Sequence, residues 1–233
     1  MNTKIINLES VDSTNEFLKR ENLSPITVVT AKIQTQGKGR RGKRWISHSD
    51  KGLYISFLFP VPEKIPNIQI ISISTATAVA KVLNEFKSEF LIKWPNDILI
   101  KGKKICGILP ELTKEKLIIG IGINLYHSEK ELQGTETPAT SLAIEKIEVP
   151  REKITNFIIE AVKNSFFKTA NGKFDLSDYE KIALIKQNTH VEIKEETGTV
   201  SGIALGIDRE GFLIVEINGK IKRVFSGDVS VRV

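Results

Sequence analysis

A run of glycines and cations bears most directly on the chemistry of this sequence. Five of the seven residues from Lys38 to Arg44 are basic, three glycines flank or separate them, and Trp45 follows. Because closely spaced like charges repel and glycine adds backbone freedom, we expect an anionic ligand to order this segment, residues 37–45, called the basic loop below. Glycine N–H groups and guanidinium groups both bind phosphate, yet the loop matches neither the P-loop nor the dinucleotide fingerprint. Nucleotide phosphate and nucleic acid both fit it.

The segment 93–97, Lys-Trp-Pro-Asn-Asp, is a second candidate for chemistry. It follows the apolar residues 90–92, which are typical of a buried strand. A lysine such as Lys93 is costly to bury there without a partner, and an anionic ligand would offset that cost. The alternative interpretation is a strand end followed by an Asx-type turn.

Glycines inside two apolar segments form a third candidate. Gly107 interrupts the segment 105–112, and Gly120 and Gly122 interrupt the segment 117–125. Glycine weakens a strand unless another group approaches its backbone closely. A flat ligand lying against these two strands would explain the glycines, and ordinary packing is the alternative.

Composition narrows the class of protein. The chain has 233 residues, 40% of them hydrophobic, and a formal net charge of +6, as expected for a globular protein that handles anions. Cys106 is the only cysteine, which excludes an intramolecular disulfide, argues against a cysteine-based zinc site and fits the cytoplasm. His48, His127 and His190 show no metal spacing. We find no signal peptide and no segment apolar enough to span a membrane.

Periodicity predicts an α+β fold in two parts. In residues 1–187 we expect a mixed, largely antiparallel sheet with strands near 2–8, 27–33, 53–59, 90–94, 98–100, 105–112 and 117–125. Helices are expected at 12–20, at 70–86, from Pro150 onward and up to about Lys186, with capping boxes at Ser13 with Glu16 and at Ser177 with Glu180. Residues 188–233 contain five short strands and an Asn218-Gly219 hairpin turn, which predicts a small β-barrel.

In their order along the chain these segments resemble the biotin protein ligases. The matching stretches are Asp12–Asn15, Gln34–Trp45, Lys93–Asp97, Lys104–Leu109 with Glu111, and Gly120–Asn124. The resemblance implies a class II synthetase-like catalytic domain and an SH3-like C-terminal barrel. It also implies that ATP and biotin form biotinyl-5′-AMP with Mg²⁺, and that the biotinyl group passes to a lysine of a biotin carboxyl carrier protein.

The resemblance further implies roles for individual residues. Lys93 and Arg40 would be catalytic, with Lys93 contacting the biotin carboxylate and the α-phosphate. The residues expected to bind biotin are Ser13, Thr14, Asn15, Gln34, Gly37, Lys38, Gly39, Arg40, Lys93, Gly107, Gly120 and Gly122. Those expected to bind the nucleotide are Lys38, Arg40, Arg41, Trp45, Lys93, Asn96 and Asn124. No metal ligands are assigned.

Two other functions stay open from the sequence. A lipoate or octanoate ligase would share the architecture, and a nucleic-acid-binding module would use the basic loop alone. Some family members carry an N-terminal DNA-binding domain, for which Ser13 lies too early, so we expect no DNA binding. Homodimerisation is a further expectation from the family. The chain departs from some relatives at Lys38, where they have arginine, and in residues 127–140, which contain no tryptophan.

Overall fold

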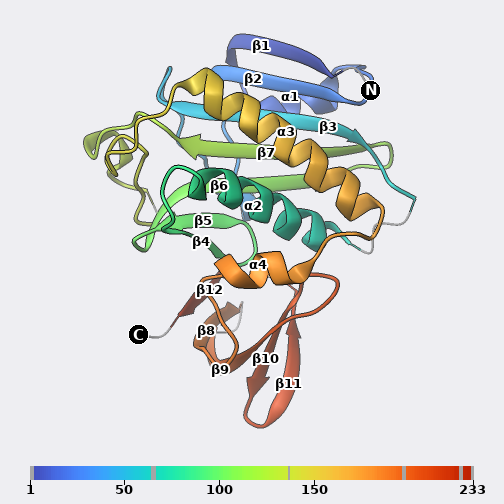
Figure 1. Cartoon of the computed structure of the whole chain (residues 1–233), viewed down its shortest axis with the longest axis vertical. Coiled ribbons are helices and arrows are strands. Elements are labelled where there is room, and N and C mark those ends of the chain that lie inside the picture. The colour runs from blue at the N-terminus through green and yellow to red at the C-terminus, as the bar shows by residue number, and fades with distance from the viewer. Residues whose placement is uncertain (1–2, 64–66, 136, 196–197, 226–227, 232–233) are drawn as a thin grey trace.

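A seven-stranded sheet forms the main part of the computed structural model, which describes residues 3–63, 67–135, 137–195, 198–225 and 228–231 (Figure 1). The strand order is β1-β2-β3-β7-β6-β5-β4. Only β1 and β2 pair in parallel, which confirms the mixed, largely antiparallel sheet. The strands are β1 Lys4–Val11, β2 Thr27–Gln34, β3 Gly52–Pro60, β4 Phe90–Lys93, β5 Asp97–Ile100, β6 Lys103–Leu112 and β7 Lys116–Asn124.

Helices cover both faces of this sheet. α2, Ile68–Asn84, and α3, Arg151–Ala170, lie side by side on one face, and α1, Thr14–Arg20, lies behind the other (Figure 1). Each face has its own cluster of buried apolar side chains. β3 is therefore buried along nearly its whole length, which explains why its sequence is almost continuously apolar, with Ser56 as the polar exception. No helix in the described ranges is long and apolar enough to cross a membrane.

The last part of the chain forms a separate antiparallel sheet of five strands in the order β11-β10-β9-β8-β12. This confirms the predicted strands and the small SH3-like domain. Asn218 and Gly219 both have positive φ, as the predicted two-residue hairpin turn requires. The strands are β8 His190–Glu195, β9 Gly198–Ile207, β10 Leu213–Ile217, β11 Lys220–Val224 and β12 Asp228–Val231.

The two sheets share one apolar core. α4, Leu176–Ile182, lies between them (Figure 1), and side chains from both sheets, such as Ile92 and Val191, belong to one cluster. Trp94 is only 1% exposed, and its Nε1 donates a hydrogen bond to the Gly211 carbonyl of the C-terminal part at 3.0 Å. Because packing is continuous across it, the division of the chain at residue 188 stays a prediction.

The two predicted capping boxes are wrong. Ser13 occupies the N-cap of α1, but its side chain makes no capping hydrogen bond. Glu16 forms ion pairs with Lys19 and Lys38 instead. At α4 the N-cap is Asp175, whose carboxylate accepts from the Ser177 N–H at 2.9 Å, and the helix ends before Lys186. Asp caps a helix as well as Ser does, so the start lies two residues earlier than predicted.

Replacing Trp94 with Phe should destabilise the protein, because the Gly211 carbonyl would lose its buried donor. Leaving such a group unsatisfied costs about 1–3 kcal/mol, and we expect that loss in the free energy of unfolding measured with urea. Trp45→Phe is the matched control, since the buried Nε1 of Trp45 has no hydrogen-bond partner among the described residues. Equal losses in the two variants would contradict this role for Trp94.

Candidate active site

The basic loop folds over the two strands that carry interior glycines. Gly107 on β6 and Gly122 on β7 lie directly opposite each other. A Cβ added to Gly107 would come within 2.8 Å of the Trp45 ring, and one added to Gly122 within 2.5 Å. Either contact is too short for a real side chain, so both glycines are needed for the indole to lie there. The group that approaches the backbone closely here is Trp45, which agrees with the packing alternative, and a flat ligand at these strands stays a prediction.

The loop also contacts the segment 93–97. Nη1 of Arg40 donates to Oδ1 of Asn96 at 3.0 Å, and Nδ2 of Asn96 donates to the Ile108 carbonyl at 2.9 Å. Within the loop, Trp45 N–H donates to the Gly37 carbonyl at 2.9 Å. Two motifs that are far apart in the sequence are therefore joined by one side-chain hydrogen bond.

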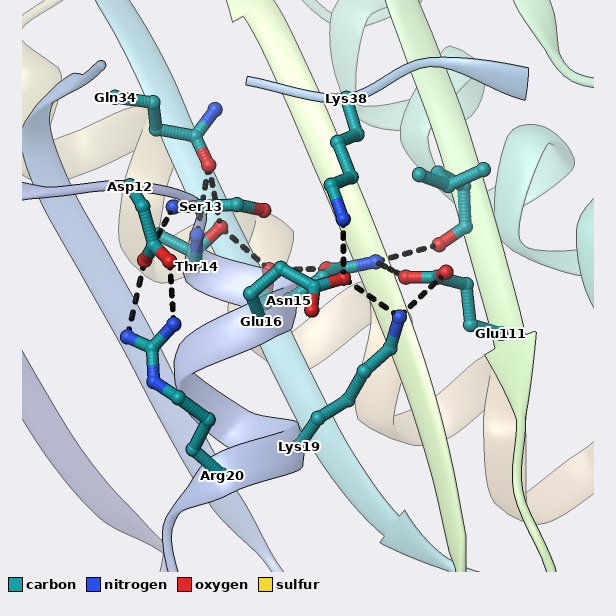
Figure 2. Close-up of polar contacts among 12 residues, drawn as sticks. Asp12, Ser13, Thr14, Asn15, Glu16, Lys19, Arg20, Gln34, Lys38 and Glu111 are labelled. Atoms are coloured by element: carbon teal, nitrogen blue, oxygen red, sulfur yellow. Dashed lines mark hydrogen bonds and ion pairs between the residues drawn. The ribbon is translucent and has the colours of Figure 1, made fainter. Parts of the chain in front are cut away.

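A buried group of polar side chains lies at one end of the site (Figure 2). Oε1 of Gln34 accepts from the N–H of Thr14 at 2.8 Å and from its hydroxyl at 3.0 Å. The fully buried Ser56 hydroxyl lies 2.6 Å from both Thr14 Oγ1 and Asn15 Oδ1. Asn15 in turn donates to Glu111 Oε2 at 2.7 Å. Such a network fixes rotamers, so the site presents donors and acceptors in set positions.

Lys104 brings a cation to the same pocket. Its Nζ lies 2.8 Å from Asp97 Oδ1 and 5.4 Å from the centroid of the Trp45 ring. Lys104 and Gly107 are three residues apart, and in a regular strand they would face opposite sides of the sheet. The register between β5 and β6 shifts beside Lys104, and this β-bulge turns both residues to the same face.

Lys93 lies on this face as well, but farther out. Cross-strand partners run from Gly107 to Asp97 and from Asp97 to Lys93, which places Lys93 two strands, or about 10 Å, from Gly107. β4 is an edge strand, where a half-buried lysine is common and requires no anion. An anion at Lys93 was expected because its strand was predicted to be fully buried.

The pocket collects most of the predicted binding residues. Those that line it are Ser13, Thr14, Asn15, Gln34, Lys38, Gly39, Arg40, Trp45, Asn96, Gly107, Gly120 and Gly122. Lys104, Ile108, Leu109 and Ile121 also line it and were not predicted. The predicted residues outside the lining are Gly37, Arg41, Lys93 and Asn124. The ligand contacts of all these residues stay predictions.

Two of these outcomes have visible structural reasons. The amide nitrogen of Asn124 is turned to the Thr140 carbonyl, at 3.0 Å, and the residue is buried. Arg41 is exposed and has positive φ. Ser56, which was not predicted as a site residue, carried a signal: it is the one aliphatic hydroxyl among the apolar and aromatic residues of β3.

Other reactive side chains do not complete a nucleophilic site. Burial raises the pKa of the Cys106 thiol, which confirms it as a small buried hydrophobic residue. Burial, and then the neighbouring His48, lower the pKa of His127 to about 4, so its ring is neutral at pH 7. Within the part of the chain that the structure describes, no group of three His, Cys, Asp or Glu side chains could hold a metal ion.

Comparison with known proteins decides the family. Residues 8–126 match the biotin/lipoate A/B protein ligase family, and residues 188–232 match the biotin protein ligase C-terminal domain. This chain belongs to the biotin/lipoate A/B protein ligase family. The chain is 32% identical to the bifunctional ligase/repressor BirA of Bacillus subtilis, over 96% of this chain and 72% of that protein.

Two further relatives show the same family relationship. The biotin–[acetyl-CoA-carboxylase] ligase of Mycobacterium tuberculosis is 28% identical over 87% of this chain and 77% of that protein. The solved structure of biotin protein ligase from Aquifex aeolicus in complex with biotin and ATP has a TM-score of 0.84 and 31% identity, and the match covers 98% of each chain. These matches confirm the predicted fold of this ligase-family protein.

In this ligase-family protein, Gly122→Ala should displace the Trp45 indole, because the added methyl would overlap the ring. We expect tryptophan emission to shift to longer wavelength while the circular dichroism of the folded protein is kept. Gly39→Ala is the matched control, since its added Cβ would have no neighbour closer than 3.4 Å. Emission that shifts in the control but stays unchanged in Gly122→Ala would refute the packing role of this glycine.

Proposed function

We propose that this protein is a biotin protein ligase, which activates biotin with ATP and transfers it to a lysine of a biotin carboxyl carrier protein. One observation carries the proposal: a buried polar group and the cations Lys38, Arg40 and Lys104 line one pocket under the basic loop. Biotin has the matching parts, a polar ureido ring and a carboxylate tail. The solved structure of the Aquifex relative contains biotin and ATP, and the Mycobacterium relative is named for acetyl-CoA carboxylase.

The polar end of the pocket suits the ureido ring. We assign hydrogen bonds with the ring to Ser13, Thr14 and Gln34. Asn15 supports them from beside Gly120, where an added Cβ would come within 2.4 Å of Asn15 Oδ1. A site built to satisfy N–H and C=O groups discriminates strongly against ligands that lack them, such as a plain fatty acyl chain.

The cationic end suits a carboxylate that must meet a phosphate. We assign to Lys104 the contact with the biotin carboxylate and the α-phosphate that the sequence resemblance gave to Lys93. Arg40 keeps its expected role beside it. A cation about 3 Å from a phosphate oxygen gains about 5 kcal/mol at an effective dielectric near 20, before desolvation. In the first step a biotin carboxylate oxygen attacks the α-phosphorus of ATP. The bond from that phosphorus to the bridging oxygen breaks, and pyrophosphate leaves.

The second step requires protection from water more than a protein nucleophile. The neutral amine of the carrier lysine attacks the carbonyl carbon of the mixed anhydride. The amine loses a proton, an amide forms and AMP leaves. Until the carrier arrives, a basic loop closed over the anhydride keeps water away from it.

We propose that Mg²⁺ enters with the ATP phosphates and is not held in a protein cage. Mg²⁺ commonly uses one or two carboxylates together with substrate phosphates and water. Asp97, whose buried Oδ1 faces Lys104, fits this pattern as a carboxylate beside the pocket. When bound, Mg²⁺ would neutralise part of the phosphate charge.

The alternatives differ in strength. Nucleic-acid binding is disfavoured, because Lys38 and Arg40 of the basic loop contact Glu16 and Asn96 of the same chain. Lipoate or octanoate ligation stays open, since the family includes both biotin and lipoate ligases. A homodimer, the lack of DNA binding and a cytoplasmic location also stay predictions.

Biotin-dependent exchange of labelled pyrophosphate into ATP tests the first step directly. We expect exchange with biotin and only background exchange with lipoate or octanoate. Exchange that depends on lipoate or octanoate would favour the alternative ligase. Background exchange with all three acids would overturn the proposed activation chemistry.

Lys104→Met should lower the rate of biotin-dependent exchange by about 10²–10³-fold, the usual effect of removing one preorganised group that stabilises transition-state charge. Lys93→Met is the matched variant, and we expect it to retain exchange within about 2-fold, as for a surface change away from the reacting atoms. Thermal unfolding of both variants checks that each is folded. A large loss in Lys93→Met together with normal activity in Lys104→Met would restore the original assignment.

A further inference from the structure

The first lysine of the basic loop ends in an ion pair with its own chain (Figure 2). Nζ of Lys38 lies 2.9 Å from Oε1 of Glu16 on α1. The same carboxylate oxygen lies 2.7 Å from Nζ of Lys19, and Lys19 lies 2.7 Å from Oε1 of Glu111 on β6. Two cations and two carboxylates therefore alternate, and their charges sum to zero. The charge of Lys38 is therefore paired with a carboxylate of the same chain.

This cluster is continuous with the wall of the pocket. Oε2 of Glu111 accepts from Nδ2 of Asn15 at 2.7 Å, and Oδ1 of Asn15 lies 2.6 Å from the buried Ser56 hydroxyl. The loop, α1, β6 and β3 are thus joined by consecutive polar contacts. The position of the loop and the position of the polar end of the pocket depend on the same side chains.

The cluster is partly shielded from water. The side chains of Glu16, Lys19 and Glu111 are 24%, 27% and 27% exposed, and that of Lys38 is 51% exposed. Contacts with Lys19 and then Lys38 lower the pKa of Glu16, so it is ionised at neutral pH. Burial lowers the pKa of Lys19, but its contacts with Glu111 and Glu16 outweigh that effect and raise it overall. Networks of this kind hold a geometry better than isolated surface pairs do.

We propose that Glu16 is a positioning residue, which holds the basic loop closed over the pocket through Lys38, and that Lys19 and Glu111 tie this ion pair to Asn15. The inference rests on the proposed ligase function and adds a division of labour within the loop. Arg40 serves the ligand, whereas the Lys38 side chain serves the position of the loop. A direct contact of Lys38 with phosphate would instead make Glu16 a repulsive neighbour of the ligand.

A double-mutant cycle separates these two roles of Lys38. The variants are Glu16→Gln, Lys38→Gln and the combination. If the ion pair positions the loop, each single change should raise the KM for biotin in pyrophosphate exchange by about 2–5-fold, the range of a partly exposed pair, with kcat nearly unchanged. The second change should then add little to the first. If Lys38→Gln costs as much with Glu16→Gln present as without it, the proposal is overturned.

The matched control removes another ion pair near the same end of the sheet. Glu9 on β1 lies 2.8 Å from Lys32 on β2, and both side chains are exposed. Glu9→Gln should leave the KM for biotin unchanged. An equal rise in KM for Glu9→Gln and Glu16→Gln would show a general charge effect and would overturn the specific role of Glu16.

Limited proteolysis gives a readout that does not depend on activity. Trypsin cleaves after the basic residues of the loop, and cleavage requires the loop to leave the sheet. In the ligand-free full chain, Glu16→Gln should raise loop cleavage by about 2–5-fold over wild type, while Glu9→Gln should not. Unchanged loop cleavage in Glu16→Gln would overturn the positioning role, whatever the exchange assay of that variant shows. Lack of biotin-dependent exchange in the wild type would overturn the ligase function and leave the proteolysis result standing.

Discussion

The contact between the Trp45 indole and the sheet backbone sets the geometry of the site. Gly107 and Gly122 face each other on neighbouring strands, so the sheet is without a Cβ at both positions and the ring lies directly against it. Trp45 closes the basic loop, and the depth at which its ring lies fixes the height of the loop above the strands. From there Arg40 reaches Asn96 at 3.0 Å. A side chain at either glycine would lift the loop and break that contact as well.

The cation that lies under the loop depends on an irregularity of the sheet. β6 contains one more residue than β5 between Gly107 and Lys104, namely Ile105, and the strand alternation resumes out of phase after it. Lys104 therefore faces the same side as Gly107 and meets Asp97. The bulge costs β6 one position of regular pairing, and it places Lys104 in the site on a backbone that the sheet holds in position. Side chains placed on strands are positioned more precisely than side chains on loops.

Much of this arrangement could be predicted from the sequence, and the exceptions share a physical cause. Alternation and helical periodicity are local, and they predicted the strands and the helices. That the basic loop and residues 93–97 belong to one site was implied by the family resemblance. The choice between Lys93 and Lys104 required the edge position of β4 and the bulge in β6, both of which arise from pairing between strands. Glu16 was predicted as part of a capping box from its spacing to Ser13. Its partner Lys38 lies in the loop, 22 residues away. Local patterns do not record contacts of that kind.

In the proposed function the strength of the anchors matters, because a loop over a reactive anhydride must both close and open. A partly exposed ion pair such as Lys38 with Glu16 contributes about 0.2–1 kcal/mol, and a hydrogen bond from a charged group, such as Arg40 to Asn96, contributes about 1.5–3 kcal/mol. Together they favour the closed loop by about 2–4 kcal/mol, a ratio of about 30 to 10³. Biotin and the carrier lysine could each enter during brief openings. A much stronger set of anchors would protect the anhydride and also exclude the lysine that must consume it.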